Sequence, residues 1–89
     1  MNVMKYFVYI IYNLRDKKYY TGITNDLFRR LKEHNKIGSS TITTTNRNSF
    51  IIVHTEQCED RDKARERELF WKSGYGRELR DKFMRNLIS

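Results

Sequence analysis

The alternation of hydrophobic and polar segments at the start of the chain predicts a β-hairpin. Residues 6–12 are aromatic or β-branched and predict a strand. The polar residues 13–17 predict a turn, and residues 18–23 return to strand character. Because side chains alternate along a strand, Val8 and Tyr9 are expected on opposite faces of the sheet.

The remaining pattern predicts three helices and one further strand. The segments are a helix from residue 27 to about 35, a loop over 36–49, a strand over 50–55, a helix from 59 to 73 ended by Gly74, and a helix from about Arg77. Residues 24–26 are N-cap candidates, and Leu79, Phe83 and Leu87 form the predicted buried stripe of the last helix. The order β-β-α-β-α-α predicts a single α+β domain (α/β in the broad sense) over residues 1–89, a small three-stranded antiparallel sheet flanked by helices.

Composition narrows the partners of such a domain. Lys and Arg number 18 against 11 acidic residues, a net charge of +7, which predicts binding to nucleic acid first and a membrane surface second. The sequence lacks both an apolar run near the ~20 residues that span a bilayer and a signal-peptide core. Cys58 is the only cysteine and no Cys/His cluster suggests zinc, so a reducing compartment such as the cytoplasm is expected.

Two tyrosines and two basic residues are candidates for function, each with an ordinary structural alternative. Tyr9 and Tyr20 lie in the predicted hairpin, where most tyrosines are packing residues. Gly22 follows Tyr20 by two residues, and a glycine inside a strand often marks a bulge or the close approach of a ligand or backbone. Arg30 and His34 share one helix face, which fits either a solvated surface or a clamp for phosphate.

Glu68 is a carboxylate in a place where the pattern predicts burial. It lies on the helical stripe formed by Ala64 and Trp71. One explanation is a surface ion pair with Lys72 or Arg65, at i+4 and i−3. The other is an oxygen ligand for Mg²⁺, which proteins often hold through one or two carboxylates.

Taken together, these positions resemble the GIY-YIG nuclease family, in particular its small bacterial single-domain members and the N-terminal domain of excision-repair nucleases. The matching segments are Phe-Val-Tyr at 7–9, Tyr-Thr-Gly at 20–22, Arg-Arg-Leu-Lys-Glu-His-Asn at 29–35, Lys-Ala-Arg-Glu-Arg-Glu at 63–68 and Lys-Ser-Gly-Tyr-Gly-Arg-Glu at 72–78. They run in order through nearly the whole chain. Excision-repair members carry a lysine after the second signature, where this chain has Ile23.

The resemblance implies a metal-dependent DNA endonuclease, with DNA repair or recombination as its setting. A single Mg²⁺ or Mn²⁺ would bind Glu68 and polarise the scissile phosphate. The implied catalytic roles are general base for Tyr9, orientation of water or phosphate for Tyr20, charge neutralisation for Arg30, and backbone binding or assistance to Tyr9 for His34. The residues expected to bind DNA are Arg29, Arg30, Lys72 and Arg77.

Two alternatives remain at this stage, together with one geometric expectation. The chain could be a catalytically inactive DNA-binding module on the same fold, or a basic protein of RNA or membrane surfaces. For an active nuclease, Tyr9 and Tyr20 are expected to face one another across the hairpin, with the first two helices packed on that same face and Glu68 pointing at the sheet. The sequence leaves the role of the threonine-rich segment 39–45 open.

Overall fold

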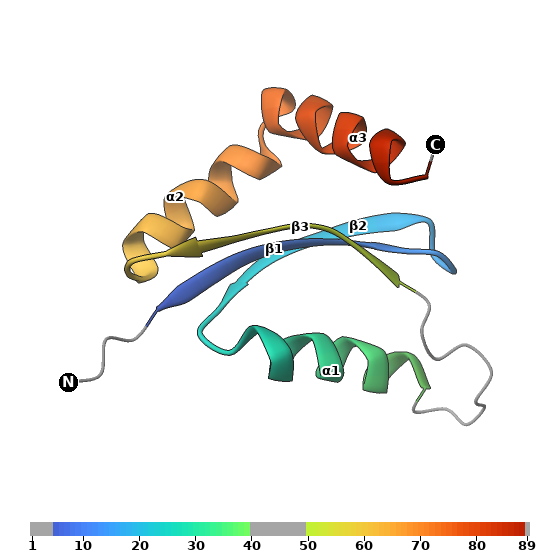
Figure 1. Cartoon of the computed structure of the whole chain (residues 1–89), viewed down its shortest axis with the longest axis horizontal. Helices are drawn as coiled ribbons and strands as arrows, with labels where there is room; N and C mark the ends of the chain where they lie inside the picture. The colour runs from blue at the N-terminus through green and yellow to red at the C-terminus, as the bar shows by residue number, and fades with distance from the viewer. Residues whose placement is uncertain (1–4, 40–49, 89) are drawn as a thin grey trace.

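A computed structural model describes residues 5–39 and 50–88, and its elements follow the predicted order β-β-α-β-α-α (Figure 1). The elements are β1 (Tyr6–Asn13), β2 (Lys18–Thr24), α1 (Leu27–Ser39), β3 (Phe50–Cys58), α2 (Arg61–Lys72) and α3 (Gly74–Ile88). The strands form one antiparallel sheet in the order β2-β1-β3, so the predicted α+β class is confirmed. Nearly all of the threonine-rich segment lies outside the described residues.

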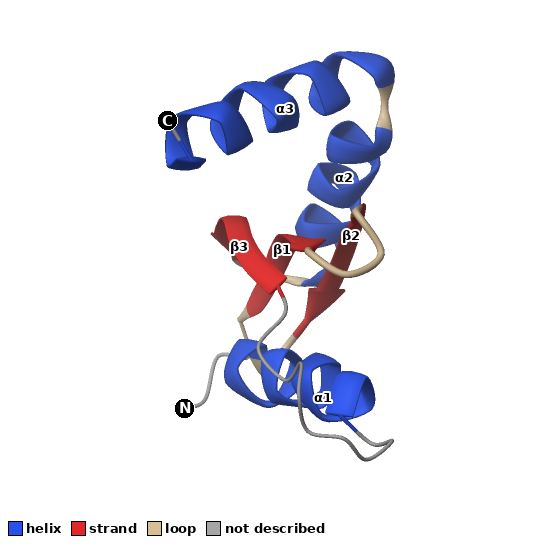
Figure 2. Ribbon diagram, turned by 90° about the vertical axis from the view of Figure 1, so that its right-hand side faces the viewer, coloured by secondary structure: helices blue, strands red, loops and turns tan. Residues whose placement is uncertain are grey.

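Helices cover both faces of the sheet, with α1 on one face and α2 and α3 on the other (Figures 1 and 2). The expectation that the first two helices share a face is therefore wrong. The physical reason lies in β1, the central strand, because it is apolar on both sides. Val8 and Ile10 are fully buried on one face, and Tyr9 and Ile11 are buried on the other. A strand of this kind needs a cover on each face.

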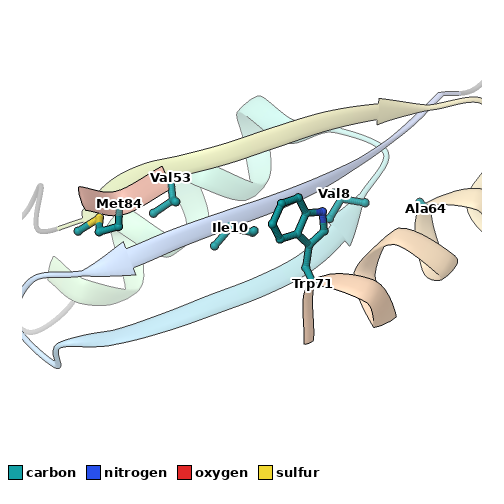
Figure 3. Close-up of a cluster of buried hydrophobic side chains, with 6 residues drawn as sticks. All are labelled: Val8, Ile10, Val53, Ala64, Trp71 and Met84. Carbon is teal, nitrogen blue, oxygen red and sulfur yellow. The ribbon is translucent and has the colours of Figure 1, made fainter. Parts of the chain in front are cut away.

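The main core lies between the sheet and the pair α2 and α3. The buried side chains of this cluster are Val8, Ile10, Val53, Ala64, Trp71 and Met84 (Figure 3). Met84, rather than the predicted Leu87, is buried on α3, whereas Leu87 is 52% exposed. No helix among the residues that the structure describes has the length and apolar run needed to cross a membrane.

Several predicted boundaries move in the structure, and local hydrogen bonds explain the change between the last two helices. α1 continues to Ser39 through residues predicted as loop, and β3 extends to Cys58. Gly74 does not end α2, because it is the first residue of α3. Ser73 separates the two helices instead, with an extended backbone, and its N–H and hydroxyl both donate to the carbonyl of Phe70, at 3.0 and 2.6 Å. A left-handed glycine is therefore not needed there.

Both helices that follow a strand begin at a capping aspartate. The side chain of Asp26 accepts a hydrogen bond from the N–H of Arg29 at 3.0 Å, and Asp60 accepts from the N–H of Lys63 at 2.9 Å. These bonds satisfy N–H groups that have no partner inside a helix. The caps fix where α1 and α2 start, and hence the positions of the candidate residues that follow them.

Candidate active site

The phenol ring of Tyr9 extends across the neighbouring strand over Gly22. The two residues are paired in the register of β1 and β2. A Cβ atom placed on Gly22 would lie 2.6 Å from the hydroxyl oxygen of Tyr9, closer than such contacts allow. The close approach predicted from this glycine is therefore real, but it is made by a tyrosine of the same sheet. Tyr9 is 6% exposed, and β2 beneath its hydroxyl is an edge strand.

Tyr20 lies on the same face of the sheet as Tyr9 but is paired with Ile11, so the two tyrosines are diagonal neighbours rather than opposite partners. Its hydroxyl donates a hydrogen bond to the carboxylate of Asp16 in the hairpin turn, at 2.9 Å. This bond is the largest cause of a raised pKa for Tyr20. Asp16 was not recognised from the sequence, although it stands four residues before Tyr20 in the predicted turn.

Arg30 is placed by α1 so that its charge acts on Tyr9. Its guanidinium lies 3.6 Å from a carboxylate oxygen of Glu33, and its buried Nε has no hydrogen-bond partner among the described residues. Burial, as the largest influence, raises the pKa of Tyr9, while the positive charge of Arg30 lowers it. The side chain of His34, the remaining candidate on α1, lies outside the described part of the structure.

Glu68, on α2, is close enough to Tyr9 for its charge to act on the tyrosine. It is 13% exposed and shares its helix face with the buried Ala64 and Trp71, and its carboxylate makes the ion pairs with Lys72 and Arg65 that the sequence offered as the alternative to a metal. Its negative charge contributes to the raised pKa of Tyr9. α1 and α2 lie on opposite faces of the sheet (Figure 2), so charges from both sides act on Tyr9, whose ring lies over the edge strand β2.

Glu68 is the candidate ligand for a metal ion. Within residues 5–39 and 50–88, no three His, Cys, Asp or Glu side chains are grouped as a metal site. A lone hard oxygen donor does not make a closed structural site. It does fit Mg²⁺, which usually keeps several waters and is held through one or two carboxylates together with substrate phosphates. Glu68 therefore suits an ion that is shared with a substrate.

The four residues expected to bind DNA are carried by three helices. Arg29 and Arg30 lie in α1, where Arg29 is 58% exposed and pairs with Asp26 and Glu33 at 3.7 and 3.5 Å. Lys72 ends α2 and is 52% exposed, and Arg77 is exposed in the first turn of α3. These cations flank the sheet from both faces, so they do not form one line along a single helix.

A polar cluster on the α2–α3 face was missed by the sequence reasoning. Glu56 of β3 accepts hydrogen bonds from Arg67 (2.9 Å from both Nε and Nη2), from Trp71 Nε1 (3.1 Å), and shares one with His54 Nε2 (3.0 Å). The hydrogen bonds from Arg67 are the main cause of a pKa of about 2 for Glu56. Because Arg67 is the residue before Glu68, its hydrogen bonds to Glu56 also attach this turn of α2 to strand β3. The available signal was polar residues at alternate positions of a strand.

Comparisons with known proteins identify the family to which this sequence and fold are similar. The family model of the GIY-YIG catalytic domain matches residues 5–81. A UPF0213 protein from Desulfotalea psychrophila is 40% identical over 63 residues, which cover 71% of this chain but only 56% of that protein. A UPF0213 protein from Halobacterium salinarum is 39% identical over 61 residues, covering 68% of this chain and 77% of its own.

A solved structure extends the comparison to three dimensions. The solution structure of a UPF0213 protein from Bacillus halodurans matches with a TM-score of 0.52 and 32% identity, over 85% of this chain and 81% of that one. The family match covers all the candidate catalytic positions from Tyr9 to Glu68. This chain therefore belongs to the GIY-YIG nuclease family.

Proposed function

We propose that this protein is a metal-dependent endonuclease that hydrolyses DNA phosphodiester bonds beside the edge strand β2. The observation that carries the proposal is the convergence of charge on one buried hydroxyl. Tyr9 lies over Gly22, and its pKa responds to the charges of Arg30 and Glu33 on α1 and of Glu68 on α2, two helices on opposite faces of the sheet.

Arg30 is proposed to bind the phosphoryl oxygens at the scissile bond. Its side chain is 42% exposed although its Nε is buried, so the outer nitrogens of the guanidinium are the ones open to a phosphate oxygen. A guanidinium matches phosphate in a planar fork and is always charged, so it would stabilise negative charge that develops as the bond breaks.

Tyr9 and Tyr20 are proposed to hold the attacking water and the phosphate. Because burial raises the pKa of Tyr9, its phenol carries a proton at neutral pH in the free protein. It therefore acts first as a hydrogen-bond donor, and accepting a proton from water requires added positive charge such as that of Arg30. Tyr20 is oriented by Asp16 and is 38% exposed, so it is open to substrate.

Glu68 is proposed to hold one Mg²⁺ or Mn²⁺ ion. When bound, the ion would supply positive charge at the scissile phosphate and at the leaving oxygen. Arg29, Lys72 and Arg77 are proposed to contact neighbouring phosphates, which give affinity but little sequence information. A small basic domain of this kind suits substrates chosen by DNA structure, as in repair or recombination.

The first test is cleavage of labelled duplex, single-stranded, flap and branched DNA with Mg²⁺, Mn²⁺ or EDTA. We expect cleavage with either metal ion and no cleavage in EDTA. Glu68→Gln is expected to reduce it by about a hundredfold or more. The matched control is Glu66→Gln, which changes an exposed carboxylate on the same helix and should leave cleavage unchanged.

These experiments distinguish an active nuclease from an inactive DNA-binding module. Binding without cleavage on every substrate would favour an inactive DNA-binding module. Cleavage that survives Glu68→Gln would show that Glu68 is not the metal ligand.

A second test compares two adjacent arginines of α1. Arg30→Ala is expected to lower turnover by about a hundredfold to a thousandfold with an unchanged melting temperature, since it removes transition-state stabilisation. Arg29→Ala removes the same charge from a side chain that is 58% exposed, so it should mainly weaken DNA binding. Near-normal turnover of Arg30→Ala would exclude Arg30 from the site.

A further inference from the structure

Each carboxylate oxygen of Glu68 forms an ion pair with a cation of the same helix. Lys72 Nζ lies 3.2 Å from one carboxylate oxygen, and Arg65 Nε lies 3.8 Å from the other. Glu68 itself is 13% exposed, whereas the side chains of Lys72 and Arg65 are 52% and 60% exposed. The carboxylate is thus held in place, while the cations that cover it are largely in water and can turn away from it.

We propose that Lys72 is a resident counterion of Glu68, which occupies the carboxylate in the free protein and moves onto a DNA phosphate when the divalent ion enters. This inference rests on the proposed metal site at Glu68. An ion bound to that carboxylate and an ammonium group 3.2 Å from one of its oxygens would repel each other strongly. Tight binding of the metal ion to Glu68 therefore requires the ammonium group of Lys72 to move away from the carboxylate.

Lys72 is a better candidate for this exchange than Arg65. Its contact with Glu68 is the shorter of the two and meets hydrogen-bond geometry. Glutamate preceding lysine by four residues is the favourable orientation for a helical pair. Lys72 is also the basic residue of the last turn of α2, where the helix dipole favours a cation. Its ammonium lies on a long flexible stem, which allows the movement that the exchange requires.

The exchange would couple metal binding to DNA binding. Without DNA, a displaced Lys72 can turn only into water, and its charge stays within a side-chain length of the metal with no anion to compensate it. With DNA, a phosphate oxygen accepts Lys72, and the repulsion is relieved. By thermodynamic linkage, DNA then strengthens metal binding by the same factor by which metal strengthens DNA binding. The consequence is that the ion binds tightly only when substrate is present.

The test measures metal affinity separately from activity. Mn²⁺ is titrated into the DNA-free protein, and binding is followed by paramagnetic broadening of amide NMR signals in α2. Lys72→Met keeps the length of the side chain and removes its charge, and it is expected to tighten Mn²⁺ binding about tenfold. The matched control is Lys63→Met, which removes the same charge from an exposed residue of α2 with no ion pair among the described residues. This control should change the affinity by less than about twofold.

A second measurement tests the destination of Lys72. DNA binding is followed by fluorescence anisotropy with Ca²⁺ and with EDTA. In the wild-type protein Ca²⁺ should strengthen DNA binding, and Lys72→Met should lose most of that gain. An equal loss of DNA affinity with and without Ca²⁺ would overturn the exchange, because Lys72 would then contact DNA regardless of the metal.

The variants also separate failure of this inference from failure of the proposed function. If Glu68→Gln abolishes Mn²⁺ binding but Lys72→Met matches the control, the metal site stands and the exchange is wrong. If Glu68→Gln leaves Mn²⁺ binding unchanged, the metal site itself is wrong. Circular dichroism melts confirm that each exposed substitution leaves the fold intact.

Discussion

Replacing Glu56 with glutamine should remove a large part of the stability of this domain. The carboxylate accepts charged hydrogen bonds from Arg67 and a bond from Trp71, and its pKa is lowered from 4.5 to about 2. One unit corresponds to about 1.36 kcal/mol, so the ionised form is favoured in the fold by about 3 kcal/mol. The side chain is 20% exposed, which limits screening by water. A domain of this size has a total stability of about 5–10 kcal/mol.

The direction of the pKa shift of Glu56 determines the pH range in which its charge stabilises the fold. Because the folded-state pKa is the lower one, the stabilisation is fully present above about pH 4.5 and is lost as the pH falls towards 2. Glu56→Gln cannot ionise, so its stability should lie about 3 kcal/mol below that of the wild type at pH 7. The difference should shrink steadily between pH 5 and pH 2.

Urea unfolding followed by tryptophan fluorescence between pH 2 and pH 7 measures this difference, since Trp71 lies in the same cluster. Glu66→Gln is the matched control, because Glu66 is exposed on α2, and it should follow the wild-type curve to within about 0.5 kcal/mol. Parallel curves for the wild type and Glu56→Gln across the whole range would refute the reasoning. They would show that the charge of Glu56 contributes nothing to folding.

Three glycines give further predictions, one on activity and two on stability. Gly22→Ala should cost only about 1 kcal/mol in urea unfolding but reduce DNA cleavage at least about tenfold, because the new Cβ would displace the Tyr9 hydroxyl, 2.6 Å away. Unchanged turnover would show that Tyr9 is not needed in this position. Gly76→Ala should cost about 2–4 kcal/mol, because its Cβ would meet the backbone carbonyl of Phe70. Gly74→Ala is the matched control, because a Cβ atom added to Gly74 would have no neighbour within 4 Å, and its stability should stay within about 1 kcal/mol of the wild type. Equal melting temperatures of Gly76→Ala and Gly74→Ala would contradict the close packing at Gly76.

The order of the elements and the identity of several site residues followed from local features of the sequence. Hydrophobic patterns identified the strands and helices, and Asp26 was among the caps expected from their position, whereas the cap at Asp60 was not predicted. Glu68 was singled out because it interrupts an apolar stripe, and its side chain is 13% exposed. Signals of this kind depend on residues a few positions apart, so the chain itself specifies them.

Only the tertiary structure decided how the segments meet. Local patterns do not state which face of the sheet a helix covers, and the burial of both Val8 and Tyr9 on opposite sides of β1 required helices on both faces. Gly22 signalled a close approach, but the approaching group came from a different strand. The bonds from Arg67 to Glu56 join residues 11 apart in sequence across two elements. Such contacts depend on the three-dimensional packing of distant segments, for which a single sequence carries no local signal.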